Sequence, residues 1–131
     1  MSHKIYGGEH RETLTAAINC ANSLHCLLRY GEARALLRRI VPKVRRVLGE
    51  SNEVTIRTRS FYADTVCRDT GATLDDLSEA VTTLEDTEQI ARRVLGGTHP
   101  TTKDIEATLQ NARAALHARD TPQPSSLSGR S

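Results

Sequence analysis

The chain has 131 residues, a formal net charge of +2 and only 3% aromatic residues. This length fits one ordinary domain and is too short for two independent enzyme-sized cores. So few aromatic residues argue against a β-sandwich or barrel, and no stretch approaches the roughly 20 apolar residues that a membrane-spanning helix needs.

Apolar residues at helical spacing predict five helices, of which the first two cover residues 13–28 and 32–48. The inward stripe of the first helix consists of Leu14, Ala17, Ile18, Ala21 and Leu24. The stripe of the second consists of Ala33, Leu36, Leu37, Ile40, Val44 and Val47. Gly49 is expected to end the second helix in a left-handed conformation. Pro42 should bend this helix near residues 38–39, because proline removes one backbone donor.

The other three helices are expected over residues 55–68, 74–95 and 101–117. Their inward residues are Ile56, Ala63, Val66 and Cys67 in the third, Leu77, Val81, Leu84, Ala91 and Val94 in the fourth, and Ile105, Leu109, Ala112 and Leu116 in the fifth. Thr73 followed three residues later by Asp76 resembles a capping box, with Asp in place of Glu. The sequence therefore predicts an all-α fold with no strand.

The predicted helices divide the chain into three parts. Residues 1–12 are expected to be an N-terminal extension, and residues 13–117 a single repeat domain. Residues 118–131 are expected to be a disordered tail, because the composition changes to TPQPSSLSGRS after Asp120. The extension lacks the apolar core of a secretory signal, and the three cysteines give no basis for a disulfide framework. We therefore expect a reducing, cytoplasmic setting.

The helices belong to an internal repeat. The phrase VRRVLGESNEVTI at residues 44–56 returns as ARRVLGGTHPTTK at residues 91–103, and a weaker copy, YGGEHRETL, covers residues 6–14. Helix pairs that repeat at this period of a little over 40 residues are typical of an α-solenoid, in which each hairpin buries its apolar face against its neighbours.

Residues 15–50 resemble the long tetratricopeptide repeat of kinesin light chains. The residues that fall in the register of that repeat are Thr15, Ala16, Asn19, Ala21, Asn22, Leu24, Arg29, Tyr30, Glu32 and Ala33. The sequence R-V-L-G at residues 46–49 and 93–96 matches the end of its second helix, and His99-Pro100 matches its loop. Leu28 stands where the family usually has the glycine between the two helices, so this turn should differ in detail. The resemblance covers roughly residues 7–116 and implies two long hairpins plus a capping helix.

The resemblance also implies a binding surface. In tetratricopeptide repeats, the first helices of successive hairpins line a concave face where peptides bind. The corresponding positions are Thr15, Asn19, Asn22 and His25 on the first helix, Arg57, Asp64 and Arg68 on the third, and Asp104 and Asn111 on the fifth. Asn side chains there could hold the backbone amides of a peptide, and Arg57 and Arg68 its carboxylates.

The sequence gives little support for a metal site, a catalytic site or a cofactor site. Cys20 and Cys26 are six residues apart, so they point in different directions on a helix and do not match zinc-ligand spacing. We expect Cys20 to pack as a small apolar residue and His25 and Cys26 to be partly exposed. None of the common nucleophile, phosphate-loop, zinc-protease or dinucleotide motifs is present in the sequence. We therefore expect no catalytic residue, no metal site and no cofactor.

The charges are distributed unevenly between two predicted helices. The helix at 32–48 is basic, with Arg34, Arg38, Arg39, Lys43, Arg45 and Arg46. The helix at 74–95 is acidic, with Asp75, Asp76, Glu79, Glu85, Asp86 and Glu88. The basic run is either a nucleic-acid or acidic-partner surface or a solvated face that partly pairs with the acidic helix. No aromatic residues interleave the arginines, so base stacking is poorly supported and nucleic acid is the less favoured partner.

The sequence therefore favours a non-enzymatic scaffold that presents a concave helical groove to a partner peptide or protein. One alternative is a self-assembly or repeat-stacking element, and another is a nucleic-acid-associated protein that uses the basic helix. A solenoid end exposes an apolar face, so we also predict a twofold dimer through the N-terminal end. Its contact would use Leu14, Ile18, Leu27 or Leu28.

Overall fold

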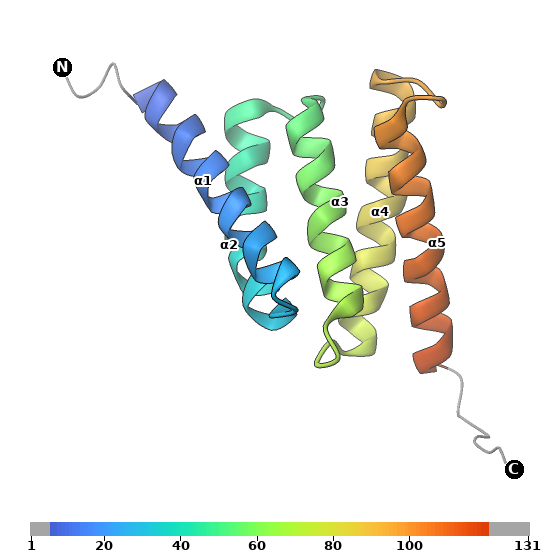
Figure 1. The fold of residues 1–131 in the computed structure, drawn as a ribbon. Helices are drawn as coiled ribbons and strands as arrows, with labels where there is room; N and C mark the ends of the chain where they lie inside the picture. Colours follow the sequence, from blue (N-terminus) through green and yellow to red (C-terminus); the bar gives the residue numbers. More distant parts are fainter. Residues whose placement is uncertain (1–5, 121–131) are drawn as a thin grey trace, which may run out of the picture.

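The computed structural model describes residues 6–120, which form five α-helices and no strand (Figure 1). The helices are α1 (Tyr6–Cys26), α2 (Tyr30–Leu48), α3 (Glu53–Arg68), α4 (Leu74–Val94) and α5 (Pro100–Asp120). The prediction of an all-α fold is confirmed for this part of the chain. No helix within residues 6–120 combines the length and the apolar character needed to cross a membrane.

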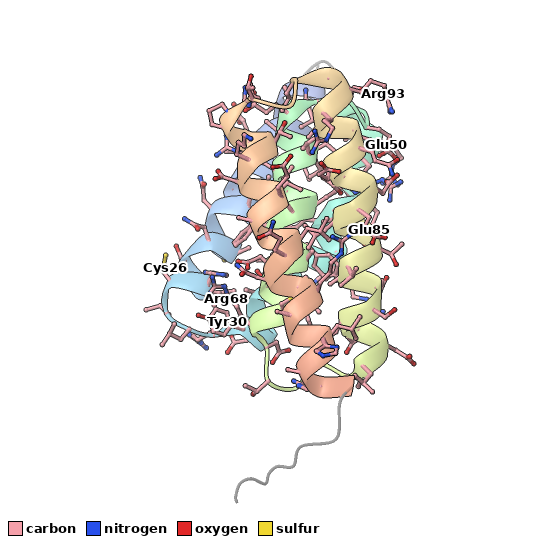
Figure 2. All side chains as sticks on the ribbon, turned by 90° about the vertical axis from the view of Figure 1, so that its right-hand side faces the viewer. Cys26, Tyr30, Glu50, Arg68, Glu85 and Arg93 are labelled. Carbon is pink, nitrogen blue, oxygen red and sulfur yellow. The ribbon has the colours of Figure 1, made fainter. Side chains whose placement is uncertain are left out.

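The helices run alternately up and down and lie in two layers (Figure 1). In that view α1, α3 and α5 form the front layer, and α2 and α4 lie behind it. Figure 2 shows the molecule turned by 90°, with α4 and α5 nearest the viewer. Each helix packs against the next one along the chain, and α5 packs against α3 as well as α4. The first halves of the two predicted hairpins and the last helix therefore share one side of the molecule.

Two helix boundaries differ from the sequence prediction by three residues or more, and the others differ by at most two. Helix α1 begins at Tyr6, so residues 6–12 of the expected extension are helical, and α5 continues to Asp120. Residues 1–5 and 121–131 lie outside the described part of the chain, which leaves the predicted tail from residue 121 onward untested. Pro42 lies inside α2, which continues to Leu48, and the bend expected near residues 38–39 stays a prediction.

Local capping groups account for several of the helix ends. The Thr73 hydroxyl accepts a hydrogen bond from the Asp76 amide, and the Asp76 carboxylate accepts one from the Thr73 amide, which confirms the predicted capping box. The Asn52 side chain caps α3 by accepting from the Val54 amide. Gly49 follows α2 with a φ of 89°, a conformation that favours glycine.

The turn between α1 and α2 contains an unusual backbone conformation at Leu28. Leu28 has a φ of 63°, the only positive φ of a non-glycine residue within the described chain. Its side chain is 70% exposed, so burial does not offset the cost of this left-handed conformation. Leucine therefore holds here a backbone conformation that glycine adopts at lower cost.

The apolar side chains form two core clusters. One joins α3, α4 and α5 and is centred on residues such as Ile56, Leu84 and Ile105. The other joins α1 and α2 around Leu37 and Val44. The Tyr62 side chain on α3 packs against both clusters. These contacts hold the first two helices and the last three together as one body.

Three predicted inward residues are exposed instead. Val47 and Val94 are 36% and 42% exposed. Both occupy the final turn of their helices, where the chain turns away at Gly49 and Gly96 and leaves that face to solvent. Cys20 is also exposed, because it lies about 100° around α1 from the fully buried Ala21. The expectation that Cys20 packs as a core residue is therefore wrong.

Candidate functional site

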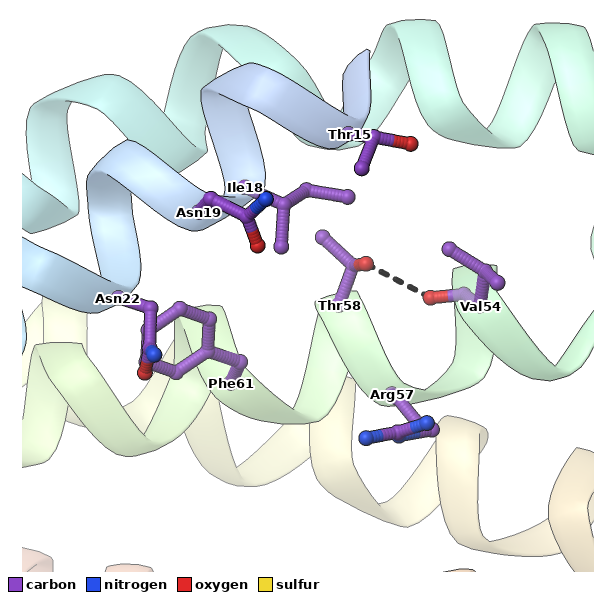
Figure 3. Close-up of a pocket in the computed structure, with 8 residues that line it drawn as sticks. All are labelled: Thr15, Ile18, Asn19, Asn22, Val54, Arg57, Thr58 and Phe61. Carbon is purple, nitrogen blue, oxygen red and sulfur yellow. Dashed lines mark hydrogen bonds between the residues drawn. The ribbon is translucent and has the colours of Figure 1, made fainter. Parts of the chain in front are cut away.

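The main candidate site is a hollow between α1 and α3 in the front layer, with a volume of about 400 Å³ (Figure 3). In Figure 1 the N-terminal half of α1 leans away from α3, and the hollow lies just beyond it, where residues 15–22 of α1 face α3. Its lining residues are Thr15, Ile18, Asn19 and Asn22 from α1, and Val54, Arg57, Thr58 and Phe61 from α3. We call it the α1–α3 hollow.

Apolar and polar groups have separate places in the α1–α3 hollow. Ile18 and Phe61 are half-buried and pack against the α1–α2 core, so they form an apolar floor. Asn19, Asn22 and Arg57 are exposed at its rim. The side chains of these three rim residues make no hydrogen bond or ion pair with any other described residue. An apolar floor with unsatisfied polar groups around it is the usual arrangement of a binding pocket.

The Thr58 side chain lies between the floor and the rim of this hollow. Its hydroxyl donates a hydrogen bond of 2.7 Å to the backbone carbonyl of Val54, one turn earlier in α3 (Figure 3). This bond satisfies the hydroxyl within the helix. The polar groups left to bind a ligand are therefore those of the rim and the Thr15 hydroxyl.

A second, smaller hollow lies between α3 and α5, with a volume of about 180 Å³. It is lined by Arg57, Ser60, Phe61, Asp64, Thr101, Asp104, Ile105 and Thr108. Arg57 and Phe61 line both hollows, so the two are adjacent across α3. Together they make a groove over the front layer, called the groove below.

Below the groove, His25 joins α1 to α3. Its Nε2 atom lies 3.4 Å from a carboxylate oxygen of Asp64, and the same oxygen accepts a hydrogen bond of 3.0 Å from the Arg68 guanidinium. The His25 ring also packs edge-on against Tyr30 and at a tilt against Phe61. The hydrogen bond and charge of Asp64 raise the pKa of Arg68. These contacts fix the position of α1 relative to the Phe61 floor.

The structure places most of the predicted site residues around this groove. Thr15, Asn19, Asn22 and Arg57 line the α1–α3 hollow, and Arg57, Asp64 and Asp104 line the α3–α5 hollow. His25 and Arg68 meet at Asp64 rather than lining either hollow. Asn111 is exposed on α5 and lines neither.

The apolar side of the site, above all Phe61, was not predicted from the sequence. This residue is the one phenylalanine in the chain. It lies four residues after Arg57 and three before Asp64, so all three share one face of α3. A phenylalanine on the same helix face as two predicted groove residues, and outside the inward stripe, is the sequence signal that could have identified Phe61 as a site residue.

A third hollow, of about 420 Å³, lies at the α1–α2 turn beside Arg29 and Arg68. Its charged groups are already paired within the protein. Arg29 binds Glu32 at 2.8 Å, Arg68 binds Asp64 at 3.0 Å, and Asp69 lies 3.3 Å from Arg34. A ligand would have to break these ion pairs, so the groove is the better candidate.

Reactive side chains do not gather in these hollows. Burial and the nearby Asp64 carboxylate raise the pKa of the Cys67 thiol to about 11, which makes it a poor nucleophile at neutral pH. Within the described chain, no three His, Cys, Asp or Glu side chains come together in a way that could hold a metal ion. The groove therefore offers hydrogen bonds, charge and apolar contact.

Comparisons with protein-family models, with curated proteins and with solved structures find no match to this chain. The interpretation of the groove therefore depends on its own geometry and on the sequence pattern.

Proposed function

We propose that the chain is a non-catalytic, cytoplasmic protein-interaction module of the tetratricopeptide type, related to the repeats of kinesin light chains. In this proposal α1–α2 and α3–α4 are two hairpins of an α-solenoid, and α5 caps the second. The two-layer arrangement and the glycine-like backbone at Leu28 support it. The groove binds a segment of a partner protein.

The observation that carries the proposal is the composition of the α1–α3 hollow. Its volume of about 400 Å³ accommodates one or two side chains of a peptide. Ile18 and Phe61 offer apolar contact to such a side chain, and burial in this hollow would supply most of the affinity. A short groove over three helices buries little area, so we expect weak binding by a single copy.

The polar rim would hold the backbone of the bound segment. An asparagine amide can donate to a peptide carbonyl and accept from a peptide N–H at the same time. Asn19 and Asn22 come from consecutive turns of α1 and lie at the same hollow (Figure 3). The Arg57 guanidinium, across the hollow, can bind a carboxylate in a bidentate manner.

Peptide binding can be tested with a library of short random peptides displayed on phage. We expect selection to yield peptides that bind the chain, and expect Asn22→Ala and Arg57→Ala each to weaken the binding of these peptides about 5- to 30-fold. The dissociation constants are measured by fluorescence anisotropy with the synthetic peptides.

Matched controls are available elsewhere on the surface. Asn111 and Arg93 are exposed on α5 and α4 and line neither hollow. Asn111→Ala and Arg93→Ala should leave the affinity unchanged within about twofold. If the control variants weaken binding as much as the groove variants, or if no peptide is selected, the proposed groove function is wrong.

Self-assembly is a second candidate function, and the exposed leucines of the α1–α2 turn favour it. Leu27 and Leu28 are 64% and 70% exposed, whereas Leu14 is only 6% exposed. Of the residues predicted for a dimer contact, Leu14 is therefore occupied in the α1–α2 core, and Ile18 forms part of the groove floor. A twofold dimer would have to form around the α1–α2 turn.

The dimer is tested by sedimentation velocity over a concentration series in moderate salt. We expect the apparent mass to rise with concentration, and the double variant Leu27→Ser/Leu28→Asn to stay monomeric. Asparagine suits position 28 because it tolerates a positive φ. Leu74→Ser, at another exposed leucine, is the control and should dimerise like the parent. A parent chain that remains monomeric at high micromolar concentration would exclude this candidate.

A further inference from the structure

The back layer carries a row of basic side chains on α2. Arg39, Lys43 and Arg46 are all exposed. They are four and three residues apart, so they fall within about 60° of one another around the helix. Exposed neighbours on or beside the same face are Glu32, Ala35, Pro42 and Val47. We call Arg39, Lys43 and Arg46 the basic row.

Several arginines of the described chain form ion pairs, but the basic row does not. Ion pairs are formed by Arg34, Arg45, Arg59, Arg68, Arg92 and Arg113. No residue of the basic row forms an ion pair with any other side chain in the described part of the chain. Its three charges are therefore directed to solvent.

The acidic helix α4 does not neutralise this row. Its carboxylates are largely engaged with other arginines, since Asp76 binds Arg34, Asp86 binds Arg59, and Glu85 binds Arg113. These ion pairs join α4 to α2, α3 and α5 rather than to the basic row.

Arg38 and Glu79 mark the border between the two helices. Burial raises the pKa of Tyr62, Glu79 raises it further, and Arg38 opposes both effects. Both charges therefore act on Tyr62, and Arg38 belongs to the α2–α4 border rather than to the row.

We infer that the basic row binds the phosphate backbone of nucleic acid, without reading base sequence. A partner protein would need an apolar centre to its interface, and the one large apolar side chain exposed on α2 beside the row is Val47, at 36%. A membrane surface would require apolar side chains that insert among the lipids. No aromatic side chain lies in the row, so bases cannot stack there, and the contact is with phosphates alone.

The geometry of the row fits successive phosphates. Arg39 and Lys43 are separated by about 6 Å along the helix axis, and Lys43 and Arg46 by about 4.5 Å. Duplex DNA presents one negative charge per about 1.7 Å of axis. Three cations at the separations given above can therefore each lie near a phosphate of one strand or the other. With three phosphate contacts, the logarithm of the binding constant should fall against the logarithm of salt concentration with a slope of about −2.7.

The test uses the full chain and a fluorescein-labelled DNA duplex of about 20 base pairs, with anisotropy measured between 25 and 200 mM KCl. We expect two duplexes of unrelated sequence to bind equally, with the slope given above. Lys43→Glu should weaken binding at least about tenfold at the lowest salt and reduce the magnitude of the slope by about one.

The matched control is Lys103→Glu. Lys103 is exposed on α5 in the front layer and forms no ion pair with a described residue, and the two variants change the net charge equally. Lys103→Glu should weaken binding less than about threefold, an effect of net charge alone. Far-ultraviolet circular dichroism of both variants checks that the helices remain.

Three outcomes would overturn the inference. One is equal loss in the Lys43 and Lys103 variants, which would indicate nonspecific charge attraction. Another is a strong preference for one duplex sequence, and the third is equal or tighter binding to phosphatidylserine vesicles or to polyglutamate. None of these results would contradict peptide binding by the groove, because the basic row lies in the opposite layer.

Discussion

Replacing Leu84 with alanine is expected to lower the free energy of unfolding by about 2–5 kcal/mol. Leu84 is fully buried in the middle of α4, in the core that joins α3, α4 and α5. Truncation removes apolar contact and leaves a cavity, because three helices meet around the side chain and can close only partly around the smaller residue. Urea denaturation followed by circular dichroism measures the change.

The same substitution at Leu74 serves as the control. Leu74 is the first residue of α4 and is 42% exposed. Leu74→Ala should change the free energy of unfolding by no more than about 0.5 kcal/mol. Equal losses at both positions would contradict the placement of Leu84 in the core.

Replacing Ala21 with leucine is expected to destabilise the fold by about 1–3 kcal/mol. Ala21 has no exposed surface and lies in the core cluster between α1 and α2. A leucine there cannot fit without moving α1, and α1 is also held to α3 through His25 and Asp64. The separation of α1 from α3 should change as well, so the α1–α3 hollow should lose its affinity for selected peptides.

Ala16→Leu is the control for this overpacking. Ala16 is exposed on the same helix, so the added atoms meet solvent, and leucine has nearly the helix propensity of alanine. We expect stability within about 0.5 kcal/mol of the parent and unchanged peptide affinity. If Ala21→Leu behaves like Ala16→Leu, then Ala21 is not at the close contact between the two helices.

The two proposed surfaces lie on opposite layers of the molecule. The groove is built from α1, α3 and α5, and the basic row from α2 alone. One chain could therefore hold a peptide and a phosphate backbone at the same time. Under these two proposals, the chain would bring a partner protein to a nucleic acid.

Much of the secondary structure could be predicted from the sequence because it depends on local patterns. The stripes with Leu14, Leu37 and Ile105 follow the helical repeat, and these residues are buried as predicted. The capping box at Thr73 depends on side chains three residues apart. Such features involve only neighbours along the chain, so a single sequence is enough to identify them.

What the tertiary structure alone decided is which faces meet and which charges pair. The Arg59 side chain is only 7% exposed and binds Asp86 at 2.9 Å, a contact between residues 27 apart that no local pattern predicts. Phe61 lines a hollow that exists only because α1 is placed beside α3. The reason is physical: helix formation is governed by local propensity and periodicity, whereas a groove and its free charges depend on how separate helices pack against one another.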